Sequence, residues 1–510
     1  MFSNKTSESE SSAPQSEELS LSVLLELLSD LEPQLFGPSD TVVSQITEDS
    51  RVVREGSLFV ARQGEHSDGR KYAAAALRSG AHAVLCEKGS GVLLEPRLEV
   101  TDIRLAWGLC AQALFADPSR SVQVVGITGT NGKTTVSSLV EQALNHLGQK
   151  VGRLGTLGFF VDGIKLTDSL TTPQPDQLAQ NLAWARAAGA KCVLLEVSSH
   201  ALSQRRVAGV EFAVVALTNL TQDHLDYHGT MKEYGEAKAR LFREGEPRAR
   251  VVNLDDALGR SLAAEFSTCM GTSAQGRTEA QIRAKSFAFS RQGMEALVSV
   301  YGEDIILSSR LLGRHNLENI LTSWAILNAL GIEGHAAGRA LGLATGVPGR
   351  FERCEKSGDD IVVVVDYAHT PDALEHALDS LRELVFEELI CVFGCGGDRD
   401  RGKRPLMGQI AGARADRVYL TSDNPRTENP LSILKQIQEG FVPSARAPLV
   451  QEDRGLAIHA AIENARAGAV VLIAGKGHED YQLIGGQVLA FDDREVARSA
   501  LARRRERNSK

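Results

Sequence analysis

The sequence has no long uninterrupted hydrophobic run. Its longest apolar stretches, such as residues 361–365, have the length of a strand, whereas a membrane-spanning helix needs about 20 apolar residues. The start of the chain is rich in serine and glutamate and has neither the basic beginning nor the apolar core of a secretory signal. The sequence therefore predicts a cytoplasmic protein without membrane insertion, and a disordered tail over residues 1–20.

The sequence also has few cysteines, tyrosines and tryptophans, and it has no excess of basic residues. The 7 cysteines show no paired, zinc-like spacing and mostly stand in apolar surroundings, so buried reduced thiols are expected. Lys and Arg number 56 against 65 Asp and Glu, a net charge of −9 that disfavours broad binding to nucleic acid or anionic membranes. The 47 glycines, against 7 tyrosines and 3 tryptophans, indicate many loops shaped by the backbone.

From residue 101 onward, short β-branched runs alternate with amphipathic helical stretches. This alternation is typical of parallel βα units, so the expected fold class is α/β. The clearest predicted strands cover residues 122–127, 192–197, 212–217, 361–366, 389–393, 418–421 and 470–474. Each is followed by a polar or glycine-rich loop, and ligands of open α/β sheets collect at those strand ends.

The chain length predicts about three domains, because 510 residues allow roughly 150 residues for each. Candidate joints lie near Asp102 and at the glycine- and proline-containing turn 346–349. The predicted domains are a smaller α/β domain over 21–102, a central domain with a parallel sheet over 103–347, and a Rossmann-like C-terminal domain over 348–510.

The run Thr-Gly-Thr-Asn-Gly-Lys-Thr-Thr at 128–135 follows a predicted strand and opens a helix with one apolar face at 136, 139, 140, 143, 144 and 147. In this context, glycine-rich backbone binds phosphates, Lys133 reaches the β- and γ-phosphates, and a threonine hydroxyl can ligate Mg²⁺. Isoleucine at 127 replaces the usual glycine, so this is a variant P-loop. The predicted ATP contacts here are Gly129, Thr130, Asn131, Gly132, Lys133, Thr134 and Thr135.

Three residues outside this loop are candidates for chemistry. Glu196 ends a predicted strand beside the P-loop, where it is either a magnesium ligand or a loop partner. His200 either orients that metal shell or satisfies a loop carbonyl. Lys238 shares the apolar stripe of a helix predicted over 232–242. Its ammonium either reaches back to solvent, or it is a reactive amine or a phosphate contact.

Together these motifs resemble the Mur ligases, ATP-dependent amide-forming enzymes of peptidoglycan assembly that are related to folylpolyglutamate synthetase. The resemblance covers nearly the whole chain after the tail. Its motifs begin at Gly126, Glu196, Glu236, Arg314, Pro348 and Asp366. It implies a central ATP-binding domain, ATP as co-substrate and Mg²⁺ as cofactor. A monomer is expected.

The resemblance also implies roles for single residues. Lys133, Glu196, His200 and Lys238 would be catalytic, and Lys238 would be carbamylated and hold Mg²⁺ with Thr134 and Glu196. Asn316, Arg350 and Asp366 would be further ATP contacts. The implied contacts of UDP-MurNAc-L-Ala-D-Glu are Ser50, Thr171, Thr172, Ser198, Gln204 and Arg206. For the two threonines, helix capping before Pro173 is an equal alternative.

The C-terminal part is similar to family members that add the third amino acid of the peptide. Its tetrad Asp-Asn-Pro-Arg at 423–426 resembles the motif of ligases that add meso-diaminopimelate, and lysine-adding relatives depart from the arginine. A planar guanidinium can clamp the second carboxylate of this diacid through two parallel hydrogen bonds. The implied diaminopimelate contacts are Arg399, Asp423, Asn424, Pro425, Arg426, Gly475 and Glu479.

The expected reaction is ATP-dependent addition of meso-diaminopimelate to UDP-MurNAc-L-Ala-D-Glu through an acyl phosphate, with closure of a mobile last domain excluding water. A lysine-adding Mur ligase and a folylpolyglutamate synthetase-like ligase remain open as alternatives. From a different class, a P-loop nucleotide switch also remains open.

Overall fold

The computed structural model describes residue 14 and residues 16–64, 67–290, 292–382, 387–442 and 446–508. The chain forms two compact units: Met1–Ser273 with Arg277–Ile282 and Thr322–Ala340, and Ala274–Gly276 with Arg283–Leu321 and Leu341–Lys510. Most of the predicted disordered tail, residues 1–13 and 15, lies outside the described residues. Its expected end at residue 20 is wrong, because Leu19–Ser20 (β1) pairs with Val42–Val43 (β3).

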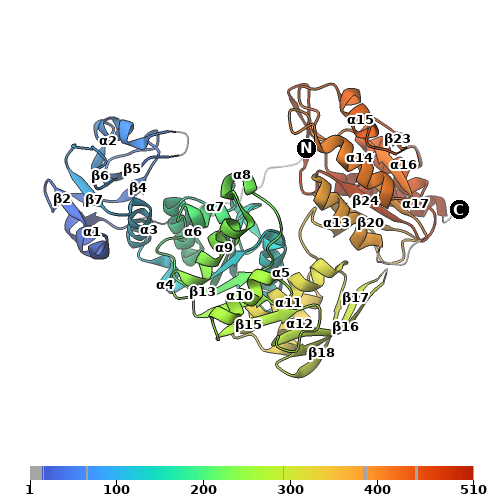
Figure 1. Cartoon of the computed structure of the whole chain (residues 1–510), viewed down its shortest axis with the longest axis horizontal. Helices are drawn as coiled ribbons and strands as arrows, with labels where there is room; N and C mark the ends of the chain where they lie inside the picture. Colours follow the sequence, from blue (N-terminus) through green and yellow to red (C-terminus); the bar gives the residue numbers. More distant parts are fainter. Residues whose placement is uncertain are drawn as a thin grey trace, which may run out of the picture. The chain divides into compact units, whose positions relative to one another are not determined.

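The first unit begins with a five-stranded sheet in the order β2-β7-β6-β5-β4 (Figure 1). Its strands are β2 (Gln34–Phe36), β4 (Gln45–Thr47), β5 (Ser57–Ala61), β6 (Ala81–Glu87) and β7 (Arg97–Val100). The helices α1 (Leu21–Leu27) and α3 (Ile103–Leu114) share one core with it, and α2 (Ala73–Arg78) shares another. This is the small α/β arrangement expected for the first part of the chain.

The same unit contains eight neighbouring strands of a second sheet, in the order β11-β10-β9-β12-β8-β13-β14-β15. Its strands are β8 (Gln123–Thr128), β9 (Val151–Gly155), β10 (Gly158–Val161), β11 (Ile164–Thr167), β12 (Cys192–Glu196), β13 (Phe212–Leu217), β14 (Ala249–Asn253) and β15 (Cys269–Ser273). Strands β9, β12, β8, β13, β14 and β15 are parallel, and β10 and β11 form an antiparallel edge. The three strands predicted here are confirmed to within one residue at each end.

The helices of this part are α4 (Pro118–Ser121), α5 (Lys133–His146), α6 (Pro175–Ala187), α7 (Ser199–Ser203), α8 (Leu225–His228), α9 (Met231–Arg243) and α10 (Ala257–Glu265). In α5 the predicted apolar positions 136, 139, 140, 143 and 144 are buried. Leu147 is not part of that face, because α5 ends at His146 and the leucine side chain is exposed. Helices α11 (Arg314–Ala329) and α12 (Gly334–Gly342) come later in the chain.

The second unit contains a six-stranded sheet in the order β19-β20-β24-β21-β22-β23. Its strands are β19 (Glu352–Arg353), β20 (Val362–Asp366), β21 (Leu389–Phe393), β22 (Arg417–Leu420), β23 (Leu449–Val450) and β24 (Val470–Ala474). Helices α13 (Pro371–Arg382), α14 (Lys403–Arg414) and α15 (Pro430–Gln438) pack on one face, and α16 (Arg454–Glu463) and α17 (Asp493–Asn508) pack on the other. All four strands predicted in this region are confirmed.

Residues of β20 show why these strands read as continuous apolar runs. Val362 and Val364 lie in the core on the side of α13, α14 and α15, and Val363 and Val365 lie in the core on the side of α16 and α17. Successive side chains point to opposite faces, so a sheet covered on both faces needs apolar residues at every position.

Other strands of the second unit were not predicted. Three of them, β16 (Ile282–Ser290), β17 (Gly293–Val300) and β18 (Glu303–Ser309), lie side by side in a sheet in the same order as in the sequence. The other two, β25 (Tyr481–Ile484) and β26 (Gln487–Ala490), form an antiparallel hairpin. All 7 cysteines are free, and all except Cys269 are buried, which confirms the expected burial of six of them. Among the described residues, no helix is long and apolar enough to cross a membrane.

Candidate functional site

The P-loop lies between the central strand β8 and helix α5, as the sequence predicts. Gly129 has a φ of 146°, and a Cβ at this position would stand 1.9 Å from Thr218 Oγ1, so only glycine fits. Lys133 Nζ donates hydrogen bonds to the carbonyl oxygens of Gly129 at 2.8 Å and Thr130 at 3.0 Å. The lysine is therefore held over the loop that is expected to bind phosphate.

The loop after β13 supports the P-loop, and the sequence analysis did not identify it. Thr218 Oγ1 donates to Asn131 O at 2.6 Å, and the backbone N–H of Asn131 donates to Asn219 Oδ1 at 3.0 Å. The backbone N–H of Thr130 donates to Asn219 O at 2.9 Å. The one available signal was position, because this loop follows the strand next to β8 at the same end of the sheet.

Glu196 lies at the end of β12, beside Ile127 of β8, and its side chain is fully buried. Its Oε2 atom accepts hydrogen bonds from Thr134 Oγ1 at 2.8 Å and Thr156 Oγ1 at 3.0 Å. Sequence reasoning missed Thr156. Carboxylate and hydroxyl oxygens are ligands that Mg²⁺ prefers, and it commonly uses one or two carboxylates together with substrate phosphates. The pair of Thr134 and Glu196 fits that requirement, although no group of three or more His, Cys, Asp or Glu suited to a metal occurs among the described residues.

Lys238 is buried on α9, with 1% of its surface exposed, which confirms its inward position and excludes the alternative that it reaches solvent. Its Nζ lies 4.3 Å from the centre of the Tyr234 ring. In the described part of the chain no hydrogen bond or ion pair reaches this ammonium. Burial, together with the positive charge of Lys133, lowers the pKa of Lys238 to about 6. The Lys238 amine can therefore be neutral near pH 7.

His200 lies in a cluster of aromatic rings supplied by α7 and α8. Its ring centre is 4.1 Å from that of Tyr227, 5.0 Å from His224 and 5.5 Å from His228. His228 Nε2 and Ser199 Oγ are 2.9 Å apart. Neither of the two predicted roles of His200 is tested by these contacts, and the three surrounding aromatic residues were not predicted.

Four of the predicted substrate contacts lie together beside Glu196. Thr172 Oγ1 donates to the backbone oxygen of Glu196 at 2.8 Å and accepts the Ser198 N–H at 3.0 Å. Arg206 donates to Thr172 O at 2.9 Å and to Gln204 Oε1 at 2.7 Å. These contacts give Thr172 a structural role and hold the Arg206 guanidinium in place.

The remaining two predicted contacts are placed differently. Thr171 Oγ1 lies 3.2 Å from Thr156 Oγ1. Helix capping does not explain the threonines, because α6 begins at Pro175 with Gln174 at its N-cap. Ser50 follows β4 in the first sheet, and no hydrogen bond joins it to the other predicted contacts in the described part of the chain.

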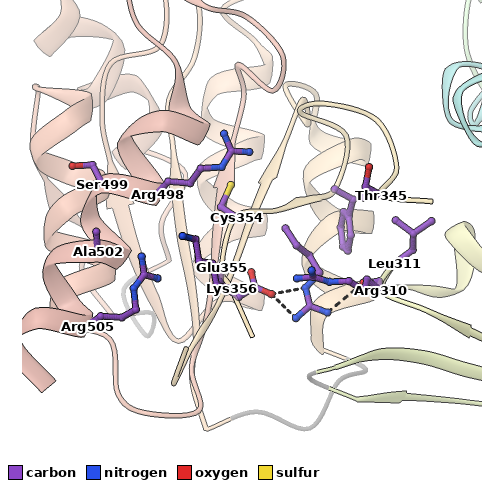
Figure 2. Close-up of a pocket in the computed structure, with 12 residues that line it drawn as sticks. Arg310, Leu311, Thr345, Cys354, Glu355, Lys356, Arg498, Ser499, Ala502 and Arg505 are labelled. Carbon is purple, nitrogen blue, oxygen red and sulfur yellow. Dashed lines mark hydrogen bonds and ion pairs between the residues drawn. The ribbon is translucent and has the colours of Figure 1, made fainter. Parts of the chain in front are cut away.

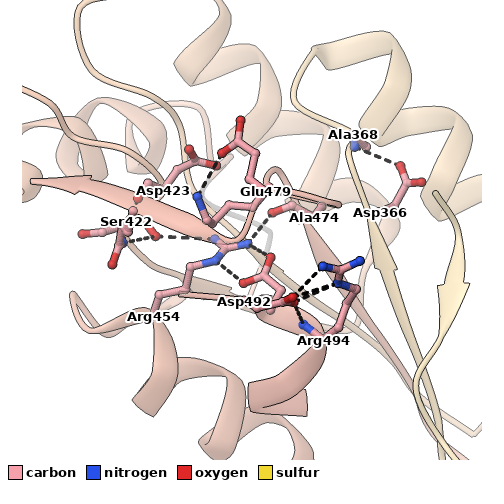
Figure 3. A network of polar contacts seen from close by, with 12 residues as sticks. Asp366, Ala368, Ser422, Asp423, Arg454, Ala474, Glu479, Asp492 and Arg494 are labelled. Atoms are coloured by element: carbon pink, nitrogen blue, oxygen red, sulfur yellow. Dashed lines mark hydrogen bonds and ion pairs between the residues drawn. The ribbon is translucent and has the colours of Figure 1, made fainter. Parts of the chain in front are cut away.

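In the second unit, Asp366 ends β20 and accepts the backbone N–H groups of Phe351 at 2.7 Å and Ala368 at 2.9 Å (Figure 3). Burial raises the pKa of this carboxyl, and nearby Arg350 opposes the rise. The Arg350 guanidinium lies over the Tyr367 ring at 4.5 Å, and its buried Nε has no hydrogen-bond partner. Arg350 and Asp366 therefore lie close together, and their role as ATP contacts stays a prediction.

Asn316 lies elsewhere in the same unit, near the start of α11. Its Nδ2 donates to the backbone oxygen of Leu312 at 2.8 Å, and the side chain is buried. The structure records no hydrogen bond between it and Arg350 or Asp366 within the described residues.

The loops of the predicted diaminopimelate contacts meet at the ends of β21, β22 and β24. Asn424 Nδ2 donates to Glu479 Oε2 at 2.8 Å, and buried Lys476 donates to the same oxygen at 3.0 Å. Gly475 has a φ of 120°, and a Cβ there would stand 2.6 Å from Asp423 Oδ2. The two loops therefore approach too closely for a larger residue at 475. Lys476, which lies between the predicted contacts Gly475 and Glu479 in the sequence, was not predicted to be a site residue.

Arg426 and Arg399 lie near the same glycine of the loop after β21. A Cβ on Gly396 would stand 3.0 Å from Arg426 Nη1 and 3.8 Å from Arg399 Cγ. Arg426 Nη1 donates to the backbone oxygen of Gly397 at 2.6 Å, whereas the exposed Arg399 makes no hydrogen bond with any described residue. Two guanidinium groups are thus available to an anionic ligand at this end of the sheet. Asp398 and Thr427 connect the two loops, because the Asp398 carboxylate accepts hydrogen bonds from the backbone N–H and the hydroxyl group of Thr427.

The second unit also has a cavity of about 550 Å³ lined by Arg310, Thr345, β19 with the loop after it, and α17 (Figure 2). None of the predicted ATP or diaminopimelate contacts lines it. Several of its basic groups are already neutralised in ion pairs: Arg353 with Glu355, Arg498 with Glu352, and Arg505 with Asp359. The cavity nevertheless adjoins the predicted site, because Phe351 lines it and donates its backbone N–H to Asp366.

Comparison with known protein families finds matches to three regions of the chain. The models "Mur ligase family, catalytic domain", "Mur ligase middle domain" and "Mur ligase, glutamate ligase domain" match residues 42–103, 127–327 and 349–477. Together with the separate sheets, they confirm the three-domain α/β class. The domain boundaries themselves stay predictions.

Individual relatives match over nearly the full length. The UDP-N-acetylmuramoyl-L-alanyl-D-glutamate--2,6-diaminopimelate ligase of Pseudomonas putida is 46% identical over 482 residues, covering 91% of this chain and 96% of that protein. The ligase of the same name from Xanthomonas campestris pv. campestris is 44% identical, with 93% and 97% covered. A solved structure of a ligase with this name has a TM-score of 0.76 and 33% identity, with 96% and 100% covered. The chain belongs to the Mur ligase family.

Proposed function

We propose that this chain is an ATP-dependent ligase that adds meso-diaminopimelate to UDP-MurNAc-L-Ala-D-Glu in the synthesis of peptidoglycan precursors. The relatives named above support the reaction. The observation that carries the choice of amino acid is the position of Arg426. Its guanidinium lies at the loop Gly396–Gly397, and Arg399 and the backbone oxygen of Asn424 lie near the same glycine. The Asn424 side chain in turn contacts Glu479. Two guanidinium groups can bind carboxylates, and the Asn424 amide and the Glu479 carboxylate can bind a carboxylate and an amino group. These groups suit a substrate that has two amino groups and two carboxylates.

The proposed chemistry has two steps. The substrate carboxylate attacks the γ-phosphorus of ATP, which forms an acyl phosphate and releases ADP. An amine of diaminopimelate then attacks the acyl carbon, loses a proton and displaces phosphate. The first step brings two anions together, so Lys133 in the P-loop must neutralise part of their charge. A bound Mg²⁺ would supply further positive charge there.

Thr134, Glu196 and Lys238 are the proposed magnesium site. The contact of Thr134 with Glu196 supports the first two. The lowered pKa and burial of Lys238 support carbamylation, because only the neutral amine reacts with CO₂ and the product is an anion that a cation could stabilise. Lys133, Glu196, His200 and Lys238 remain the proposed catalytic residues.

The remaining predicted contacts keep their roles in this proposal. The P-loop residues 129–135 with Asn316, Arg350 and Asp366 are proposed to bind ATP. Ser50, Thr171, Thr172, Ser198, Gln204 and Arg206 are proposed to bind the nucleotide-sugar peptide, although the inward contacts of Thr172 favour a supporting role for it. Arg399, Asp423, Asn424, Pro425, Arg426, Gly475 and Glu479 are proposed to bind diaminopimelate. The enzyme is proposed to work as a monomer in the cytoplasm.

Release of ADP by the purified protein tests this proposal. ADP and phosphate should form rapidly only when ATP, Mg²⁺, the UDP-MurNAc dipeptide and diaminopimelate are all present, and omission of any one should stop the release. Addition of EDTA should also stop it, and excess Mg²⁺ should restore it. Steady ADP release without the dipeptide and the amino acid would instead support the nucleotide switch.

A further inference from the structure

Lys476 is a fully buried lysine that lies behind the proposed diaminopimelate site. Its ammonium has no exposed surface, and it donates hydrogen bonds to Asn424 Oδ1 at 3.2 Å and Glu479 Oε2 at 3.0 Å. Its Nζ also lies 5.3 Å from the centre of the Tyr481 ring. An ammonium with these partners cannot reach a substrate directly, so any part it plays in recognition passes through Asn424 and Glu479.

The contacts of Asn424 fix which way its amide points. Its Oδ1 accepts both the Lys476 ammonium and the backbone N–H of Leu483 at 2.9 Å. A flipped amide would place its NH₂ group against these two donors, which is unfavourable. Lys476 and Leu483 therefore hold the oxygen inward and the NH₂ group toward Glu479.

This orientation leaves recognition groups available. One N–H of Asn424 Nδ2 donates to Glu479 Oε2, and the second makes no hydrogen bond with any described residue. Glu479 Oε1 likewise has no recorded partner there. The free N–H of Asn424 can donate to a carboxylate, and Glu479 Oε1 can accept from an ammonium group. Together they match an α-amino acid centre, in which a carboxylate and an ammonium group are bonded to the same carbon.

We propose that Lys476 is a positioning residue that sets the specificity of this site by fixing the donor face of Asn424 and the place of Glu479. The inference rests on the proposed function. Its ligand is the far α-amino acid centre of the diamino diacid. Lysine has no carboxylate at that end, so an Asn424 held as a donor favours the diacid over lysine.

Three variants test the role of Lys476: Lys476→Met, Lys476→Arg, and Lys435→Met as the matched control on an exposed position of α15. Losing a hydrogen bond from a charged group should raise the KM for diaminopimelate about 10- to 100-fold in Lys476→Met. The KM for ATP should stay within about twofold, and Lys476→Arg should restore part of the affinity. Lys435→Met should behave as the wild type.

The preference for the diacid is the second readout. The ratio of kcat/KM for diaminopimelate to that for lysine should fall in Lys476→Met, because a freed Asn424 can turn its oxygen toward the ligand. In an Asn424→Ala background the same substitution should raise the KM for diaminopimelate by a smaller factor than in the wild type, because one of the two residues it acts through is gone.

The outcomes separate this inference from the proposed function. A wild-type enzyme that does not add diaminopimelate overturns both. An active wild type with an unchanged KM in Lys476→Met, an equal rise in the KM for ATP, or the same effect in the Asn424→Ala background overturns only the role of Lys476. Thermal unfolding is measured first, and Lys476→Gln replaces Lys476→Met if the latter is unfolded at the assay temperature.

Discussion

The guanidinium of Arg454 and the carboxylate of Asp493 form two hydrogen bonds of 2.7 Å, and neither side chain has exposed surface. Arg454 Nη2 also donates to the backbone oxygen of Ala474 at 3.0 Å, and Nη1 to that of Ser422 at 3.5 Å. In the view of Figure 3, Arg454 lies below Asp423 and Glu479. One buried cation thus holds the residues that precede both diaminopimelate loops.

Arg454→Ala should strongly destabilise the second unit. The substitution leaves the Asp493 carboxylate buried without its partner, and breaking such a pair costs about 3–5 kcal/mol. Denaturant unfolding measures this loss. Arg498→Ala is the control, because Arg498 pairs with Glu352 with 52% of its side chain exposed, and such pairs contribute about 1 kcal/mol or less. Equal losses in the two variants would contradict the importance of burial.

Arg426→Ala should weaken binding of diaminopimelate by about 2–5 kcal/mol, or thirtyfold to several thousandfold, because the second carboxylate loses its cation. Arg426→Lys should recover only part of this loss, since an ammonium keeps the charge but cannot form two parallel hydrogen bonds. Steady-state kinetics with varied diaminopimelate measures the effect. An unchanged KM in Arg426→Ala would remove the arginine from the site.

Lys238→Ala should abolish turnover, and a small added carboxylate should partly restore it if the lysine is carbamylated. Lys232→Ala on the same helix is the matched control, because Lys232 is exposed and should be dispensable. ADP release measures both variants with and without acetate or formate. Full activity of Lys238→Ala without additives would refute the carbamate.

The stability conferred by Glu428 should depend on pH. Its two hydrogen bonds from Arg404, at 2.9 and 3.0 Å, hold the pKa of this carboxyl at about 2, below the ordinary value of 4.5. A carboxyl with a depressed pKa stabilises the folded state above its unfolded pKa, and this contribution is lost as the pH falls toward the folded value. The difference in unfolding free energy between wild type and Glu428→Gln should therefore be constant above about pH 5 and shrink toward pH 3. A difference that does not change over this range would contradict the pairing.

The sequence predicted those features that depend on local pattern. The apolar runs gave the parallel strands, and the P-loop, Glu196 and the inward Lys238 follow from spacing along single elements. The support of the P-loop by Thr218 and Asn219 was missed, because these residues meet it only through the pairing of β8 with β13. The strands β16 to β18 were missed because their exposed faces carry charged and polar residues that break the apolar runs.

The residues of the C-terminal site were also predicted only in part. The motif at 423–426 indicated its residues, but Lys476 and Arg454 were missed, since a buried charge looks like any surface charge in sequence. Their partners, Asn424 and Asp493, are 52 and 39 positions away along the chain. Only the fold brings them together.

Direct competition between diaminopimelate and lysine tests the central claim. The purified enzyme is given ATP, Mg²⁺, the UDP-MurNAc dipeptide and equal concentrations of both amino acids, and mass spectrometry identifies the tripeptide product. We expect nearly all product to contain diaminopimelate in the wild type, and a lower share of it in Arg426→Ala. A wild-type product that contains lysine in comparable amount would contradict the assignment of the site to a diamino diacid.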